Sequence, residues 1–551
     1  MEFRKATLAL LLVLTLVFVS FPQMKVDAQT KTIVVPDDYT TIQEAISSAA
    51  ESDTVFVKQG IYNENLTISK SISLLGEDSY NTIINGSKLG TAILIIADNV
   101  KVSGFTVKTG ESPTPPGYMA PDKPHGIHLL HVNYCNVSGN NVEYTGYGIW
   151  LYGSSNNLIN NNNCTYNWDG IAIQQSYNNQ ITGNKLDTNR FGVRFSSSEN
   201  NILRNNNLTN NDILILENSF LNDVDSSNKI NDKPIYYWVN QSDKTIPTDA
   251  GIVILVNCIQ ITVQNLFIQN HQYGIIFVDT QNSTIKNNKI EDNYYGIWLI
   301  NSSKNHITEN NITNNGYPGG LNFYSSSYNT VEKNNFIGNF YGLKFSYSSF
   351  NNISENNIED CQEQAISIFD ACKNNSITAN NIKNNRGGIW FEYPTRYTDE
   401  YYSNYNKILR NNIDSNTDWG ILLQPTVQNI FSENNITNNG KGVRLNAQEN
   451  SNEFYLNNFK NNTLDIEQWG NATTWDNGTI GNYWDKYTGI DNNGDGIGDT
   501  PYIINDNNQD NYPLMEPVEI PEFPSWTPFL ISGLIATFLM SIFKKRMGVR
   551  Q

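Results

Sequence analysis

Hydrophobic residues recur along this chain in blocks of 22 residues that each begin with glycine. Gly126, Gly148, Gly170 and Gly192 are 22 residues apart, and after an interruption the series resumes at Gly274 with spacings mostly of 22 to 24. Numbered from that glycine, positions 2, 4, 12 and 17 are apolar in most blocks. The alternation at positions 2 and 4 predicts a short strand with one buried face, and positions 12 and 17 predict two more strands.

Stacking is the arrangement that makes sense of these blocks. One block cannot bury its own apolar face, whereas stacked blocks can. Asparagine recurs at positions 10 and 15, and asparagine tolerates turn conformations and can bond the amide one rung away. The pattern predicts an all-β fold, a single-stranded parallel β-helix of roughly fifteen rungs and about 70 Å length at one strand spacing per rung.

Both ends of the chain differ from the repeat. Residues 1–28 have two basic residues, an apolar run and a small-residue ending, which is typical of a cleaved signal peptide, with an uncleaved anchor helix as the alternative. Residues 526–543 are mostly apolar and precede Lys544-Lys545-Arg546, which predicts one transmembrane helix with residues 544–551 in the cytoplasm. We therefore expect a membrane-anchored protein on the extracellular side.

The repeat also sets the expected domain boundaries. An amphipathic segment at 42–50 predicts a helix that caps the first rung. The expected regions are an N-terminal cap with the first rungs (29–125), repeats (126–216), an insertion (217–250), repeats (251–465), a C-terminal cap (466–515) and a linker (516–525).

Composition limits the partners. The formal charge of −18 disfavours nucleic acid, because phosphate backbones would be repelled. Five cysteines are too few for a disulfide scaffold, and Cys135 and Cys164 occupy repeat positions 10 and 17, where we expect small buried residues. Sequons such as Asn65-Leu-Thr67 and Asn311-Ile-Thr313 are candidate glycosylation sites on an exported chain.

Three stretches outside the regular blocks carry a family resemblance. Residues 34–76, 228–247 and 481–514 resemble the NosD-like right-handed parallel β-helix family, within the wider carbohydrate-binding and sugar-hydrolase group. The resemblance implies a right-handed coil, and members are often labelled periplasmic copper-binding proteins that serve a copper enzyme. This chain departs from that setting in its predicted membrane tail. Pro521-Glu522-Phe523-Pro524 is similar to archaeal surface-protein sorting tails, which implies a sorting protease as a partner.

Two segments have metal-ligand chemistry. His125, His128 and His131 lie within seven residues, and imidazole suits copper, although alternation along a strand separates the three rings. The loop DNNGDGIGD at 491–499 places oxygen ligands at alternate positions and begins like an EF-hand loop, which predicts a structural calcium site. The calcium candidates are Asp491, Asn493, Asp495 and Asp499.

Outward-facing aromatic residues are the candidates for glycan contact. Position 3 holds Trp150, Trp298 and Trp390, and position 5 holds Tyr152 and Tyr324. Exposed rings on a flat sheet can stack on sugars. Asp370 and Glu392 lie on adjacent rungs beside an insertion at 393–404, which makes them the candidate carboxylate pair for glycoside chemistry.

The sequence favours a surface protein that binds polysaccharide, or other envelope glycans and proteins, without catalysis. Two alternatives stay open. One is a polysaccharide lyase, hydrolase or epimerase-like enzyme, and the other is a NosD-like copper-delivery protein.

Overall fold

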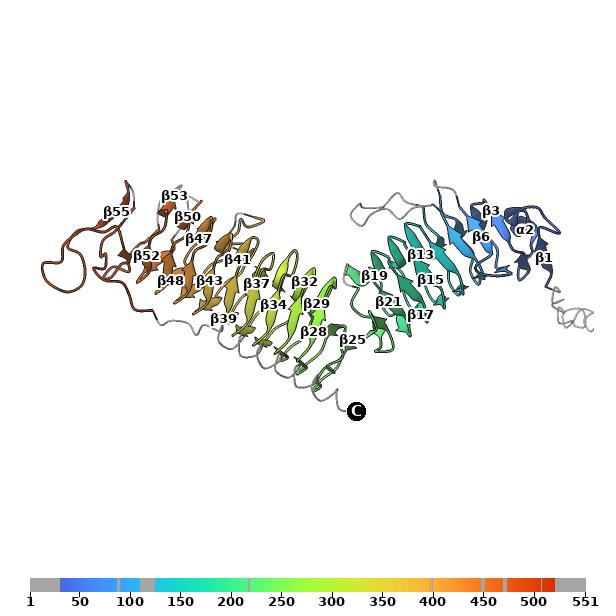
Figure 1. The fold of residues 1–551 in the computed structure, drawn as a ribbon, viewed down its shortest axis with the longest axis horizontal. Helices are drawn as coiled ribbons and strands as arrows, with labels where there is room; N and C mark the ends of the chain where they lie inside the picture. The colour runs from blue at the N-terminus through green and yellow to red at the C-terminus, as the bar shows by residue number, and fades with distance from the viewer. Residues whose placement is uncertain are drawn as a thin grey trace, which may run out of the picture.

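The computed structural model describes residues 30–86, 90–109, 124–216, 219–396, 398, 400–446, 451–468, 473–506 and 508–520. Over these residues the chain is an all-β, right-handed solenoid of about 19 turns, which confirms the predicted architecture (Figure 1). The predicted number of rungs was too low. The glycine pattern does not identify rungs such as those of β22 (Asp212–Leu216) and β53 (Leu464–Gln468), because they have an aspartate where other rungs have glycine.

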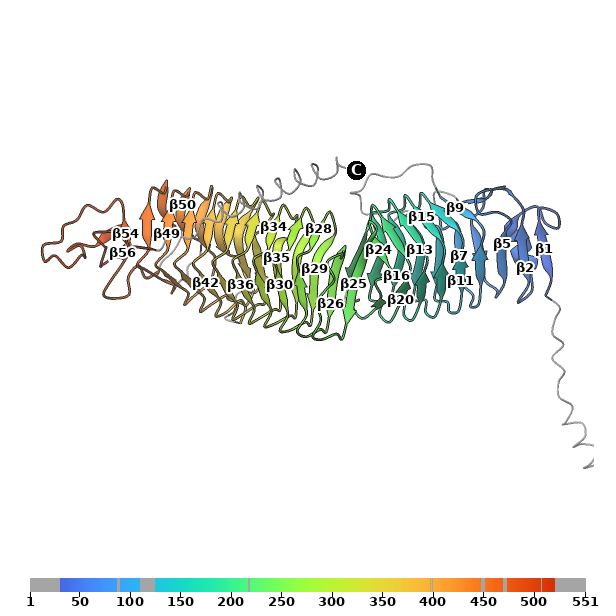
Figure 2. The same ribbon diagram turned by 60° about the horizontal axis from the view of Figure 1, so that its bottom comes forward.

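The solenoid consists of two coils. The first coil runs from β1 (Thr32–Val35) to β24 (Lys229–Ile230), and the second from β26 (Ile252–Val256) to β54 (Tyr483–Trp484). They meet at an angle at β25 (Lys233–Val239) in Figure 1, and the 60° turn of Figure 2 shows the strands of successive rungs in parallel rows. β25 pairs antiparallel with β24 and parallel with β26, so this strand joins the two stacks.

Each coil has three sheets. In the first coil, sheet A runs from β1 to β23 (Asp223–Val224) and sheet B from β3 (Gly60–Tyr62) to β24. In the second coil, sheet G runs from β27 (Thr262–Gln264) to β51 (Glu453–Tyr455) and sheet H from β28 (Phe267–Gln269) to β54. Sheet C of the first coil contains β4 (Leu66–Ile68), β7 (Ile93–Ile95), β10 (Ile127–Leu130), β13 (Tyr147–Tyr152), β16 (Asp169–Gln174), β19 (Phe191–Ser196) and β22.

Sheet E of the second coil corresponds to sheet C. Its strands are β25, β26, β29 (Tyr273–Val278), β32 (Tyr295–Ile300), β35 (Gly319–Tyr324), β38 (Leu343–Ser346), β41 (Gln364–Phe369), β44 (Gly387–Phe391), β47 (Trp419–Leu423), β50 (Lys441–Leu445) and β53. Both sheets are formed by repeat positions 2 to 5.

Like residues stack on like residues inside the coils. Ile149, Ile171 and Val193 are directly opposite one another on successive rungs and are fully buried. The repeat glycine is needed for this stacking, since a Cβ on Gly148 would come 2.5 Å from the carbonyl oxygen of Gly170. The predicted apolar rows are therefore the interior of the solenoid.

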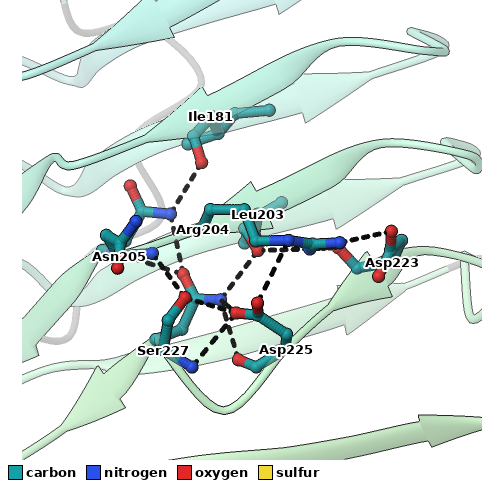
Figure 3. Close-up of polar contacts among 9 residues, drawn as sticks. Ile181, Leu203, Arg204, Asn205, Asp223, Asp225 and Ser227 are labelled. Carbon is teal, nitrogen blue, oxygen red and sulfur yellow. Dashed lines mark hydrogen bonds and ion pairs between the residues drawn. The ribbon is translucent and has the colours of Figure 1, made fainter.

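The asparagine rows are buried ladders between rungs. Oδ1 of Asn179 accepts hydrogen bonds from the backbone N–H and from Nδ2 of Asn157, at 2.9 and 3.1 Å. Figure 3 shows the last steps of one ladder, where side-chain amides donate to the carbonyl groups of Ile181 and Leu203. The residue with a left-handed backbone conformation is the one before the ladder asparagine, as in Asn178 with φ of 55°. The turn and the ladder are therefore formed by two neighbouring positions.

The coils share a packed junction. Alternate residues of β26 belong to different cores: Ile254 packs with the first coil, and Leu255 with the second. Sheet E therefore covers the open end of the first coil with its outer face, over β26 and β29. This double burial explains the unbroken apolar run of β26.

The ends of the described chain are closed differently. Residues 42–48 form the helix α2 (Ile42–Ser48), whose buried residues face the first rungs, while its capping role stays a prediction. At the other end, Trp475 and Trp484 complete the core of the second coil. None of the helices in the described ranges is long and apolar enough to cross a membrane. The predicted signal peptide, 1–28, and span, 526–543, lie outside the described residues.

Candidate functional site

Polar and aromatic side chains gather on the outer face of sheet C. His128 lies opposite Trp150 on the next rung. The same outward row continues with Ala172 and then Arg194 on the two rungs that follow. Tyr147 lies opposite Asp169 on the neighbouring row. We define the sheet C cluster as His125, His128, Tyr147, Trp150, Asp169 and Arg194.

The rings of the cluster pack in pairs. The imidazole of His128 stacks on Trp150 with centroids 4.0 Å apart, and that of His125 stacks on Tyr147 at 4.9 Å. His125 also meets Trp150 edge to face at 4.6 Å. These contacts place four rings from two successive rungs in one compact group.

Arg194 links the rings to a buried carboxylate. Its Nη1 donates to the hydroxyl of Tyr147 and lies 3.2 Å from Oδ2 of Asp169, whose side chain is fully buried. Sequence reasoning missed Tyr147, Asp169 and Arg194 as site residues. In the sequence, the one indication of these residues is their place on outward rows beside Trp150. That indication is weak until the pairing register of the rungs is known.

Burial shifts the protonation of the cluster. It lowers the pKa of His125 to about 4 and that of His128 to about 3, the latter with help from the two neighbouring histidines. It raises the pKa of Asp169 to about 6, against the opposing effect of Arg194. At neutral pH the imidazoles are therefore uncharged, and Arg194 balances the ionised carboxylate.

Three buried polar atoms of the cluster lack hydrogen-bond partners among the described residues. They are Nε2 of His128, Nε1 of Trp150 and Oδ1 of Asp169. Buried polar groups are nearly always paired, so each such atom needs an explanation. Together they offer donor and acceptor groups beside stacked rings, which suits a hydroxyl-rich ligand.

The predicted histidine site does not assemble as three ligands. The rings of His125 and His128 are 6.1 Å apart and nearly perpendicular, while His131 is exposed and contacts Tyr152 instead. Across the described ranges there is no group of three or more His, Cys, Asp and Glu side chains that could hold a metal. All five cysteines are buried and unpaired, and the burial of Cys135 and Cys164 agrees with their repeat positions. This arrangement of side chains does not fit a copper site.

The predicted aromatic residues of sheet E occupy different environments. Trp298 stacks on Tyr295 at 4.8 Å and packs against the core of the first coil, so it helps to close the junction. Trp390 is half-buried on the same outward row. Tyr324, at the end of β35, is 48% exposed. Of these three residues, Tyr324 is the most exposed to solvent.

The candidate carboxylates have separate partners. Asp370 is buried and accepts hydrogen bonds from the hydroxyl of Tyr347 and from the backbone and side chain of Thr395, which fastens the insertion to the coil. Glu392 accepts a hydrogen bond from Ser367 and lies 3.8 Å from Lys344. These contacts give Asp370 a structural role.

The predicted calcium loop is held by its own hydrogen bonds. Asp491 accepts from the backbone N–H groups of Gly494 and Gly496, and these bonds lower its pKa. Asp499 accepts from both nitrogens of Asn492, and Asp495 accepts from the side chain of Asn493. The loop keeps its carboxylates exposed, and calcium there stays a prediction.

A cleft of about 820 Å³ lies at the junction of the coils. Its lining includes Leu221, Asp223, Asp225, Trp238 and Gln241. Arg204 bridges Asp223 and Asp225 at its edge, as Figure 3 shows. The cleft is more acidic than the sheet C cluster and has fewer stacked rings.

Comparison with known families identifies the chain. Residues 46–248 and 399–489, more than half of the chain, match the family described as "Periplasmic copper-binding protein (NosD)". The chain belongs to the NosD family. Residues 250–398 of this NosD-family protein match the "Right handed beta helix region" family, so the two matches alternate along one solenoid.

One curated relative is a "Cell surface glycoprotein" of Methanothermus fervidus, which is 30% identical over 152 residues. The match covers 27% of this chain and 23% of the relative, so it spans less than a quarter of that protein's length.

Two solved structures illustrate the low-scoring likeness to known folds. The catalytic domain of a GH87 alpha-1,3-glucanase matches with a TM-score of 0.31 and 12% identity, over 71% of this chain and 66% of that one. The A-module of the Azotobacter vinelandii mannuronan C-5 epimerase AlgE4 matches with a TM-score of 0.28 and 14% identity, over 79% and 94%. Scores this low support no inference about activity.

Proposed function

We propose that this NosD-family protein is a cell-surface protein that binds glycans without chemical conversion, with the sheet C cluster as its main contact. The observation that carries the proposal is the meeting of stacked rings and three unpartnered buried polar atoms on one outer face. Aromatic faces pack on the apolar faces of sugars, and the polar atoms bond hydroxyl groups. The surface glycoprotein relative supports the location.

The charge balance of the cluster favours a neutral sugar. Arg194 and Asp169 offset each other at neutral pH, and the histidines are uncharged. Recognition then depends on ring stacking and hydroxyl groups.

Retention on polysaccharides tests the proposal. The full-length protein is incubated with neutral and acidic polysaccharides, and both retention and release of shorter products are recorded. We expect retention without products, and Trp150→Ala should weaken retention by about tenfold through loss of stacking. Tyr177→Ala is the matched control, because Tyr177 is an exposed ring (41%) on the same coil but outside the cluster. Unchanged retention in Trp150→Ala would place binding elsewhere.

A polysaccharide-modifying enzyme is the second candidate. The observation in its favour is Asp169, a buried carboxyl with its pKa raised to about 6, next to Arg194 and Tyr147. A carboxyl of that pKa can act as a general acid. Released products that vanish with Asp169→Asn, and persist with Glu392→Gln, would establish this function.

Other features of the sequence extend the proposal. We propose a cleaved leader at 1–28, a membrane tether at 526–543 with a sorting protease as a partner, and structural calcium at 491–499. Calcium should raise the melting temperature, and Asp491→Asn should remove that response. Copper delivery would require copper binding that is lost when His125, His128 and His131 are all replaced by alanine.

A further inference from the structure

The outer face of sheet H carries asparagine at the same position of seven consecutive strands. These strands run along the second coil from β34 (Asn311–Thr313) to β52 (Asn458–Lys460), and their register pairs the asparagines rung after rung (Figure 1). We call them the outer asparagine row. Its members are Asn311, Asn335, Asn357, Asn381, Asn412, Asn435 and Asn458.

Neither turn geometry nor stacking explains the composition of this row. The buried ladder asparagines follow left-handed turn residues, whereas the outer row lies within strands, where asparagine is unfavourable. The corresponding outward row of sheet G stacks in the same way with mixed residues, such as Thr284, His306 and Lys407. The outer asparagine row therefore indicates a use for amide groups on this face.

One amide of the row already binds a backbone segment. Nδ2 of Asn458 donates to the carbonyl oxygen of Val518 at 2.9 Å, and its Oδ1 accepts from the N–H of Val518 at 2.8 Å. Nδ2 also donates to Oδ1 of Asn435 at 2.7 Å. An amide has two N–H donors and two acceptor positions, which allows both sets of bonds. A member of the row can thus bind an extended chain and keep its bond to the neighbouring rung.

Burial along the row agrees with this contact. Asn458, which Val518 covers, is 1% exposed, while the other six members are half-buried. Their amides have outward surface left for a chain that lies as Val518 does.

The C-terminal segment runs toward the earlier rungs. Leu514 pairs with Tyr483 of β54, and Val518 contacts Asn458 on the rung before it. A chain that continues in this direction next meets Asn435. At about 3.3 Å per extended residue and about 4.8 Å per rung, residues 519–525 can extend over about four further rungs.

We propose that the outer asparagine row binds the chain's own C-terminal segment, residues 518–525, in an extended conformation along sheet H. The amides bond its backbone carbonyl and N–H groups as Asn458 bonds those of Val518. Pro521 and Pro524 favour the extended conformation. The predicted span begins at residue 526, so the docked segment also turns sheet H toward the membrane, and this orientation rests on the proposed tether.

Cysteine cross-linking tests the docked position. The full-length protein in detergent carries Glu522→Cys with either Asn412→Cys or Asn207→Cys, and it is treated with a short bis-maleimide. The five native cysteines are buried and should not react. We expect the pair with Asn412→Cys to react faster by about tenfold, because Asn207 holds an outward strand position on the first coil. Equal rates for the two pairs would overturn the proposal.

Release of Val518 tests the role of the amides. Asn458→Ala should slow the cross-linking of the faster pair by about tenfold, since Val518 loses both hydrogen bonds. Val518→Pro, which removes the donated N–H and leaves the row intact, should act in the same direction. Asn335→Ala is the matched control, because Asn335 lies five rungs earlier in the row. Melting temperatures confirm that each variant is folded.

The outcomes separate docking from the other proposals. An unchanged rate in both Asn458→Ala and Val518→Pro, or an equal loss in Asn335→Ala, would contradict the docking. Extraction of the wild type from membranes by an alkaline wash would overturn the tether and the orientation toward the membrane, but not the docking. Polysaccharide retention should be the same in all these variants, because the sheet C cluster lies on the first coil.

Discussion

The first and second coils have similar interiors and different outer faces. Both stack branched apolar residues in register, and both continue the asparagine ladders. Outside, sheet C carries His128, Trp150 and Arg194 on one row, whereas the matching row of sheet E carries residues such as Lys344 and Ser367. Stacking constrains the inner rows, and the outer rows are free to differ in chemistry between coils.

The junction offers the sharpest way to break this comparison. Ile254→Ala should cost about 4 kcal/mol, because it opens a cavity where the outer face of β26 packs on the first coil. Hydrogen exchange should then show lost protection in the last rungs of the first coil. Leu255→Ala, on the opposite face of the same strand, should instead affect the second coil. Identical exchange patterns in both variants would mean that the coils are not separate cores.

A ladder substitution should cost slightly less and should be equal in both coils. Asn179→Ala removes the acceptor of two hydrogen bonds from Asn157 and leaves buried groups unpaired, for a loss of about 3 kcal/mol. Asn334→Ala does the same in the second coil, where Oδ1 of Asn334 accepts from the backbone N–H and from Nδ2 of Asn310. The neighbouring Asn178→Ala, at an exposed turn position, should cost less. Urea unfolding measures all three, and a greater loss in Asn178→Ala would contradict the ladder.

Acid should affect the first coil through its buried histidines. Their folded pKa values lie below the unfolded value near 6.5, so the folded state binds fewer protons and loses stability as pH falls below about 6.5. Between pH 7 and pH 5.5 the loss should be about 2 kcal/mol. The His125→Asn/His128→Asn variant should lack it, as melting temperatures across this range would show.

The contribution of Asp169 to stability changes with pH in the opposite direction. Its raised pKa stabilises the fold below about pH 4 and that contribution is lost as pH rises to about 6. Asp169→Asn should therefore make the acid-induced loss steeper. A variant whose melting temperature follows the wild type at every pH would show that Asp169 is not buried as described.

Exposed ion pairs should matter least. Arg386 bonds Glu363 and Asp418 across three rungs of the second coil, but its side chain is 51% exposed. Solvent screens such pairs, so Arg386→Ala should lower the melting temperature only slightly, and the difference should vanish in high salt. A large drop that persists in salt would assign this network a greater role.

The repeat predicted the interior well because stacking imposes its period on the sequence. The rows of Ile149 and Ile159, and the ladders through Asn157 and Asn162, lie where the spacing placed them. A third ladder, through Asn167 and Asn189, was overlooked in the sequence although it has the same spacing. Rows in which residues only stack on their counterparts in neighbouring rungs can be predicted from a single sequence.

The outer chemistry was harder to predict because it joins rungs far apart in sequence. The contact of Tyr147, Asp169 and Arg194 can be predicted only when the register of three rungs is known. Asp370 and Glu392 are on adjacent rungs as expected, but local partners bind each separately. One feature of the sequence indicates the junction, namely the apolar run of β26. In this run the outward positions are as hydrophobic as the inward ones.

The cost of a rung in chain length has a consequence for recognition. Most rungs take 22 to 24 residues. A segment of that length would span about 75 Å if fully extended, whereas it advances the coil by only about 4.8 Å. Backbone and side-chain bonds to both neighbours hold that advance constant. Outward side chains therefore repeat at a constant spacing along the coil. A polymer that binds along them is selected by how closely the period of its own units matches that spacing.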